Sequence, residues 1–287
     1  MNIKKTLTLK YVEDLLESLQ QSKSILDLEL PFEEINENNF SIFPSFIQFY
    51  SSWIRSKYSG KLIVHDNLKE LLFQKRDGEL LEDTIPNYNK YLFVCSILSW
   101  SKGVVLDSAD FKQSLRKHNG LFNENAKNLK CFRASEMLLA SFDFDRNLEN
   151  RGLLRPLYDN NGYLRDELFF THHIVPEILT EVARRYSPSY FKDSFKDDDI
   201  INLGKIIYEL FKNTHEWGRS SFESSTNLTP NVRAIYINLH RSTHQGFLNS
   251  YKTQPALFNY FENPVFRKEG QLYFLEISLF KSETIGY

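Results

Sequence analysis

The sequence is poor in cysteine and carries almost no excess charge. Two cysteines, Cys95 and Cys131, occur among 287 residues, both in apolar surroundings. Two distant cysteines give neither a disulfide framework nor the ligand spacing of a zinc site. The 35 basic and 37 acidic residues are mixed along the chain and give a formal net charge of −2. Because a nucleic-acid-binding protein needs a basic face, we expect no nucleic-acid partner.

Long apolar runs are also lacking. No stretch of 18 apolar residues occurs, so the sequence predicts no membrane-spanning helix and no membrane partner. The N-terminal residues are not followed by the apolar core of a secretory signal, and we expect a cytoplasmic protein. P-loop and dinucleotide-binding glycine patterns are missing as well. With 41% hydrophobic residues, including 24 Phe and 15 Tyr, the chain is long enough for one or two well-packed domains.

Short strands and helices alternate over the first two thirds of the chain. In residues 44–57, for example, Phe46, Phe49 and Trp53 recur at helical spacing, and Pro44 suits a first helical turn. Such alternation is typical of βα units and predicts a mixed α/β fold with a partly parallel sheet. We expect strands over 25–30, 61–65 and 104–106, helices over 44–57, 89–101, 132–140 and 174–186, and a polar, turn-rich connection over 143–166.

The last third contains the clearest helix of the sequence, over residues 197–217. Aspartates lead it and Gly218 follows it, as helix ends require. Beyond it, alternation over 232–239 and an apolar run over 271–280 predict two strands. Between them we expect a helical region over 243–261 that is broken at Pro255. The apolar face of the helix consists of Ile200, Ile201, Leu203, Ile206, Ile207, Leu210 and Phe211.

Within this helix, residues 209–218 read Glu-Leu-Phe-Lys-Asn-Thr-His-Glu-Trp-Gly. Glu209 and Asn213 are four residues apart and therefore share one helix face. The segment resembles the N-box of the GHKL ATPases, the histidine kinase-like, Bergerat-fold superfamily. The resemblance implies that Asn213 ligates a Mg²⁺ bound to the phosphates of ATP. It also implies that Glu209 is the catalytic general base that acts on the attacking water.

The segments after this helix follow the order of the same family: a polar loop, a strand, a helical region and an apolar strand. The next family motif, the G1 box, reads Asp-x-Gly-x-Gly. Here Lys281 takes the place of the aspartate that accepts a hydrogen bond from adenine, and a lysine has only donors. Glu283 takes the place of the first glycine, where the family lets backbone approach the nucleotide. Gly286 remains as a nucleotide-contacting residue, one position out of register.

These features predict two domains. Residues 1–190 form an α/β domain of unrecognised family, and residues 191–287 form a partial histidine kinase-like ATPase domain of Bergerat α/β-sandwich type. Because the sequence ends at Tyr287, before the G2 box and the ATP lid, we expect a truncated or degenerate module. A strand that ends near residue 280 without a successor predicts an exposed sheet edge, and hence self-association or a protein partner.

The leading hypothesis is a regulatory or interaction protein, a pseudo-ATPase that binds ATP and Mg²⁺ weakly or not at all. A working Mg²⁺-dependent ATPase, completed by a partner or by an unrecognised motif, is one alternative, and its reaction would be ATP hydrolysis. A plain α/β interaction domain with a chance N-box is the other. No dimerisation helix with a phospho-acceptor histidine is visible, which argues against a histidine kinase. Neither zinc nor haem is expected.

Three further groups of residues have features of metal sites, but we predict no metal binding at any of them. His240 and His244 have a spacing that suits zinc on a helix, but a third ligand is missing and His240 closes a predicted strand. The adjacent pair at residues 172–173 points to different sides. Asp143 and Asp145 lack the glycine and the final glutamate of a calcium loop.

Overall fold

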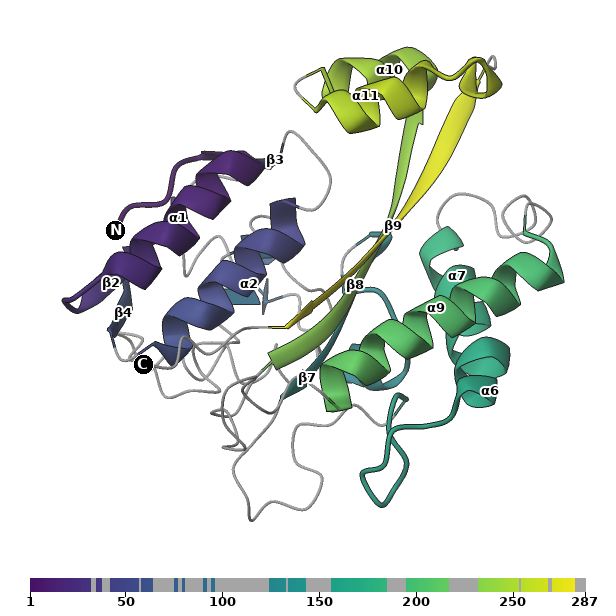
Figure 1. The fold of residues 1–287 in the computed structure, drawn as a ribbon, viewed down its shortest axis with the longest axis horizontal. Helices are drawn as coiled ribbons and strands as arrows, with labels where there is room; N and C mark the ends of the chain where they lie inside the picture. Colours follow the sequence, from purple (N-terminus) through teal and green to yellow (C-terminus); the bar gives the residue numbers. More distant parts are fainter. Residues whose placement is uncertain are drawn as a thin grey trace.

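The computed structural model shows a mixed α/β fold, as the alternation of short strands and helices predicted (Figure 1). A three-stranded antiparallel sheet lies at the centre, and helices cover both of its faces. The structure describes residues 1–31, 35–37, 42–56, 58–63, 75–76, 79–80, 90–91, 94–95, 124–132, 134–142, 156–184, 195–216, 232–252, 254–267 and 270–281.

The central sheet has the strand order β7-β8-β9, with β7 spanning Glu136–Phe142, β8 Val232–Thr243 and β9 Gln271–Lys281. Both pairings are antiparallel. Side chains alternate between the two faces of each strand. Leu138 and Tyr236 therefore lie in one hydrophobic core, and their neighbours Leu139 and Ile237 lie in the other. Apolar residues at odd and even positions are both needed because the sheet is covered on both sides.

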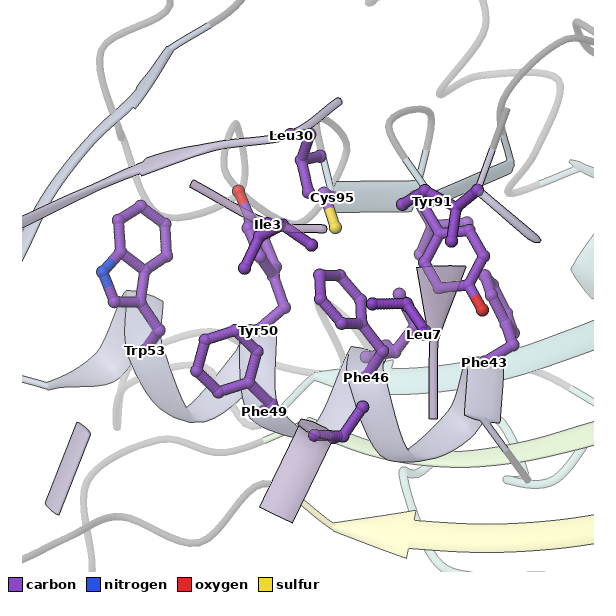
Figure 2. Close-up of a cluster of buried hydrophobic side chains, with 14 of the residues drawn as sticks. Ile3, Leu7, Leu30, Phe43, Phe46, Phe49, Tyr50, Trp53, Tyr91 and Cys95 are labelled. Atoms are coloured by element: carbon purple, nitrogen blue, oxygen red, sulfur yellow. The ribbon is translucent and has the colours of Figure 1, made fainter. Parts of the chain in front are cut away.

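Helix α2 (Ile42–Arg55) supplies more buried residues to the first core than any other described element, and α1 (Leu9–Gln21) packs beside it. Figure 2 shows its aromatic side chains in a row, each at most 1% exposed: Phe43, Phe46, Phe49, Tyr50 and Trp53. Burying each such side chain contributes about 1.5–3 kcal/mol. The indole N–H of Trp53 donates a hydrogen bond of 2.9 Å to a backbone carbonyl of β2 (Leu26–Glu29).

The N-terminal strands are parallel. Strand β2 pairs with β4 (Ser59–Ile63), and β1 (Thr6–Leu7) pairs with β3 (Asn36–Glu37). The strands expected near residues 25–30 and 61–65 are confirmed. Among the described residues, however, the parallel pairs form separate two-stranded sheets and the central sheet is antiparallel, so no single sheet is partly parallel. A short antiparallel pair, β5 (Lys75–Arg76) and β6 (Glu79–Leu80), lies farther along the chain.

In the part of the chain that the structure describes, several helical elements lie on the second face of the central sheet. They are α6 (Glu167–Phe169), the π-helical turn η1 (Phe170–Ile174), α7 (Val175–Ala183) and α9 (Asp197–Glu216). Gly204 of α9 lies directly against Thr171 of η1, where any Cβ atom would come within 2.8 Å of the Thr171 Cα. Glycine therefore permits the close approach of these two elements.

The far end of the β8–β9 ribbon carries a small helical cap (Figure 1). It consists of α10 (His244–Ser250), α11 (Pro255–Glu262) and the 3₁₀ turn η2 (Pro264–Phe266). Its core is aromatic: the rings of Phe247 and Phe261 stack with centroids 4.7 Å apart. The predicted helical region with a break at Pro255 is thus confirmed.

One predicted element is wrong. Residues 132–140 were expected to form a helix, but residues 136–142 form strand β7. The strand pairs along its whole length with β8, so the chain before residue 190 contributes to the same sheet as the chain after it. The division at residue 190 stays a prediction, although the described residues on its two sides share one core.

Other expectations fall wholly or partly outside the described residues. The strand at 104–106 is not described, and of the helix at 89–101 the structure describes 90–91 and 94–95, which are helical. Of the polar connection at 143–166, residues 156–166 are described and contain turns and an isolated bridge. Among the described residues, no helix combines the length and the apolar character needed to cross a membrane.

Candidate functional site

Helix α9 begins and ends close to where the sequence predicts. Asp197, Asp198 and Asp199 form its first turn, where carboxylates are stabilised by the helix dipole. Ile207 and Phe211 are buried against the sheet, at 2% and 1% exposure. This packing fixes which side of the helix faces solvent.

Glu209 and Asn213 both lie on the exposed side of α9. Four residues along an α-helix correspond to a rise of about 6 Å, so the carboxylate and the amide are neighbours on one face. Ile206 and Leu210 share this side, with 57% and 47% of their surface exposed. Both belong to the apolar face that the sequence predicts for this helix, but the burial is greatest on the side that carries Ile207 and Phe211.

The chemistry of the exposed pair suits one hard cation together with an anionic ligand. An amide oxygen and a carboxylate are oxygen donors, which Mg²⁺ prefers, and Mg²⁺ completes its shell with substrate phosphates and water. Within the described part of the chain, no group of three His, Cys, Asp or Glu side chains could hold a metal ion by itself. Asn213 would therefore act as a single protein ligand to a cation that arrives with its phosphates.

The other residues of the predicted site lie at or beyond the end of β9. Lys281 is the last residue of that strand and pairs in register with Arg233 of β8. Glu283 and Gly286 lie outside the described residues, as do the side chains at positions 215 and 216. The structure therefore places Glu209 and Asn213 on one helix face, whereas Gly286 is not described.

A fully buried arginine lies between α9 and the sheet, and it was not among the predicted site residues. Arg233 is 0% exposed, and its guanidinium Nη1 donates a hydrogen bond of 2.9 Å to the Tyr158 hydroxyl. Its Cζ atom lies 5.9 Å from the Tyr158 ring centre and 6.0 Å from that of Phe211. The available signal was position: Arg233 has the same strand parity as Ile235 and therefore shares its buried face.

One buried ion pair and one partly buried histidine–carboxylate contact lie on the opposite face of the sheet, and neither was predicted. Lys90 Nζ contacts Glu136 Oε1 at 2.8 Å, and His240 Nε2 contacts Glu276 Oε2 at 2.7 Å. The partners are 46 and 36 residues apart in the chain. No local motif marks such contacts, because only the tertiary fold brings the partners together.

The histidines that were considered as metal ligands have separate surroundings. His240 contacts Glu276, whereas the Nε2 atom of His244 lies 2.8 Å from the backbone oxygen of Phe261 in the helical cap. His172 and His173 are exposed on η1.

Comparisons with protein-family models, with curated proteins and with solved structures find no match for this chain. The chemistry of its own residues is therefore the basis for assigning a function.

Proposed function

We propose that this chain is a GHKL-type module with a degenerate ATP site, which acts as a regulatory or interaction protein. The observation that carries the proposal is the placement of Glu209 and Asn213 side by side on the exposed face of α9. That helix packs on an antiparallel sheet, and the chain continues through β8, the helical cap and β9. This order agrees with the one on which the resemblance rests.

In this proposal, bound Mg²⁺ would neutralise the phosphate charge of ATP, and Asn213 would hold the cation through its amide oxygen. Glu209, one helical turn earlier, would orient a water molecule and accept its proton. Ile207 and Phe211 fix the rotation of the helix, because their burial against the sheet keeps the other side of α9 in solvent.

The site is degenerate because of Lys281. An ammonium group only donates hydrogen bonds, so it cannot accept one from the adenine amino group. We therefore expect weak binding, with a dissociation constant on the order of 1 mM. The substitution Lys281→Asp supplies the missing acceptor, so that the adenine amino group no longer faces another donor. Because a hydrogen bond to a charged group contributes about 1.5–3 kcal/mol, the variant is expected to bind about 10–100-fold more tightly.

The test is a titration of the whole chain with ATP, in the presence and absence of Mg²⁺, in which binding is measured by ligand-observed NMR and by calorimetry. Asn213→Ala should abolish the Mg²⁺-dependent part of binding. Asn202→Ala is the matched control: Asn202 is exposed on the same helix, about 16 Å away along its axis. If Asn213→Ala and Asn202→Ala bind ATP equally well, or if Lys281→Asp binds ATP no more tightly than the wild-type chain, the resemblance to the N-box is a chance pattern.

A working ATPase remains the alternative, and micromolar binding with turnover that is lost in Glu209→Ala would favour it. The other candidate is an interaction domain that needs no nucleotide, and the exposure of Ile206 and Leu210 favours it. Apolar side chains that share one helix face in solvent are typical contact residues. Light scattering over a range of concentrations tests the predicted self-association, and Ile206→Ser with Leu210→Ser should reduce it.

A further inference from the structure

The ammonium group of Lys90 is enclosed by three aromatic rings and one carboxylate. Its Nζ atom lies 4.6 Å from the ring centre of Phe43 and 5.9 Å from those of Tyr91 and Tyr236. It also contacts Glu136 Oε1 at 2.8 Å. The side chain of Lys90 is only 8% exposed, so this arrangement lies inside the protein and not on its surface.

The rings also contact one another, so they form a continuous wall. The centroid of Phe43 is 5.1 Å from that of Tyr91 and 5.0 Å from that of Tyr236. Phe43 comes from α2, Tyr236 from β8 and Glu136 from β7, so three packed elements fix the shape of the enclosure. Figure 2 shows Phe43 and Tyr91 together at one end of the α2 row.

Simple packing does not call for a lysine at this position. Burying an ammonium group is costly, and an apolar side chain of similar volume often serves a core equally well or better. A cation among aromatic faces and a carboxylate is, by contrast, the arrangement by which proteins recognise alkylammonium ligands. Glu136 also keeps a second buried oxygen, Oε2, which accepts no hydrogen bond from the residues described.

We propose that Phe43, Tyr91, Tyr236 and Glu136 form a binding site for a primary alkylammonium group, and that Lys90 is its tethered occupant. The rings supply the negative faces of their quadrupoles, and Glu136 supplies the compensating charge and a hydrogen-bond acceptor. The occupied site joins residues 90–91 to the central sheet. A free alkylammonium ion of the same shape binds in the enclosure when the lysine side chain is removed.

The experiment replaces the tethered occupant by a free one. Lys90→Ala removes Cγ, Cδ, Cε and Nζ, which together match n-propylammonium. Thermal unfolding of Lys90→Ala is followed while n-propylammonium chloride is added, with sodium chloride at equal ionic strength as reference. We expect saturable stabilisation, in which a ligand at ten times its dissociation constant raises the ratio of folded to unfolded protein about 11-fold. The wild-type chain should not respond, because Lys90 already fills the site.

Two controls separate recognition from the filling of a cavity. The neutral analogue 1-propanol should stabilise Lys90→Ala far less than n-propylammonium does. Phe43→Leu in the Lys90→Ala background should weaken the apparent affinity about fivefold, since it removes the closest ring. Equal rescue by the alcohol, or no rescue by the ammonium ion, overturns the proposal.

The measurement also works if Lys90→Ala does not fold in buffer. The yield of refolded protein is then compared between n-propylammonium chloride and sodium chloride, and rescue by the former alone is the expected result. Lys90→Met provides a further check, because it fills the enclosure with an uncharged chain of similar length. It should show no response to n-propylammonium, and a response equal to that of Lys90→Ala counts against the proposed site.

Discussion

The contact between Gly204 of α9 and Thr171 of η1 predicts the effect of one added methyl group. In Gly204→Ala, the new Cβ would lie 2.8 Å from both Cα and Cγ2 of Thr171, and 3.2 Å from its Cβ. One of the crowded atoms belongs to the backbone of a buried residue, so a side-chain rotation cannot relieve the contact. The two elements must separate, and α9 must shift on the sheet.

Two opposing terms decide the sign. Alanine favours the helical conformation over glycine by about 1 kcal/mol. Overpacking a buried contact costs about 1–3 kcal/mol, and a backbone contact belongs in the upper part of that range. We therefore expect Gly204→Ala to lower the free energy of unfolding by about 1–2 kcal/mol, as the balance of the two terms. Gly204→Val should lower it further, because it adds two more carbon atoms and is a poorer helix former.

Urea unfolding followed by far-ultraviolet circular dichroism measures this difference by linear extrapolation. Asn202→Ala is the control, since Asn202 is exposed on the same helix and its replacement changes helix propensity without crowding. The control should gain a few tenths of a kcal/mol. If Gly204→Ala is as stable as the wild-type chain or more so, the inference that α9 and η1 are in obligatory close contact is refuted.

Three further outcomes follow from buried groups. Trp53→Phe should cost about 1 kcal/mol through the lost indole hydrogen bond, and Trp53→Ala about 3–5 kcal/mol, both measured by urea unfolding. Tyr158→Phe removes an acceptor from the buried guanidinium of Arg233 and should cost about 1.5–3 kcal/mol; an unchanged midpoint would contradict this role. Burial raises the pKa of the Cys95 thiol well above its ordinary value. Cys131 is partly exposed, so it should react with a thiol reagent before Cys95 does in the native protein. Modification of both thiols at the same rate would contradict the burial of Cys95.

The best predicted parts of the fold have strong local signals. Helix α9 has acidic residues in its first turn and apolar residues at helical spacing, and strands β8 and β9 stand out by their apolar pattern. The helical cap was predicted as a helical region with a break at Pro255, which is where α11 begins. Helix α1 was overlooked even though Val12, Leu15 and Leu19 have helical spacing and are buried. That helix was within reach of the same reasoning.

The candidate site was only partly predictable. The shared face of Glu209 and Asn213 follows from their spacing on a helix, which the structure contains. The exposure of Ile206 does not follow from spacing, because the sequence does not say how much of an apolar face the neighbouring sheet will cover. The enclosure around Lys90 was invisible for a stronger reason: its rings and carboxylate come from positions 43, 91, 136 and 236, which only the tertiary fold brings together.

The misassigned strand β7 shows how long-range pairing overrides local preference. Its residues Glu136, Met137, Leu138 and Ala140 favour helices, and its apolar side chains point to both faces, so no alternation of apolar and polar residues reveals a strand. Pairing with β8 satisfies the backbone groups along one edge of β7, and both faces of the strand are buried in the two cores. Propensity differences of a few tenths of a kcal/mol per residue are too small to oppose that burial.

A row of polar residues across the sheet fixes the register of this pairing. Glu136 lies opposite Asn238, and Asn238 lies opposite Glu276, so two carboxylates flank one amide. Lys90 contacts the first carboxylate and His240 the second. A shift of β7 by two residues would keep its apolar faces inward but would separate Glu136 from Lys90 and leave a charge buried without its partner. The apolar residues thus determine which faces of β7 are buried, and the ion pair selects one register among those that apolar burial alone would allow.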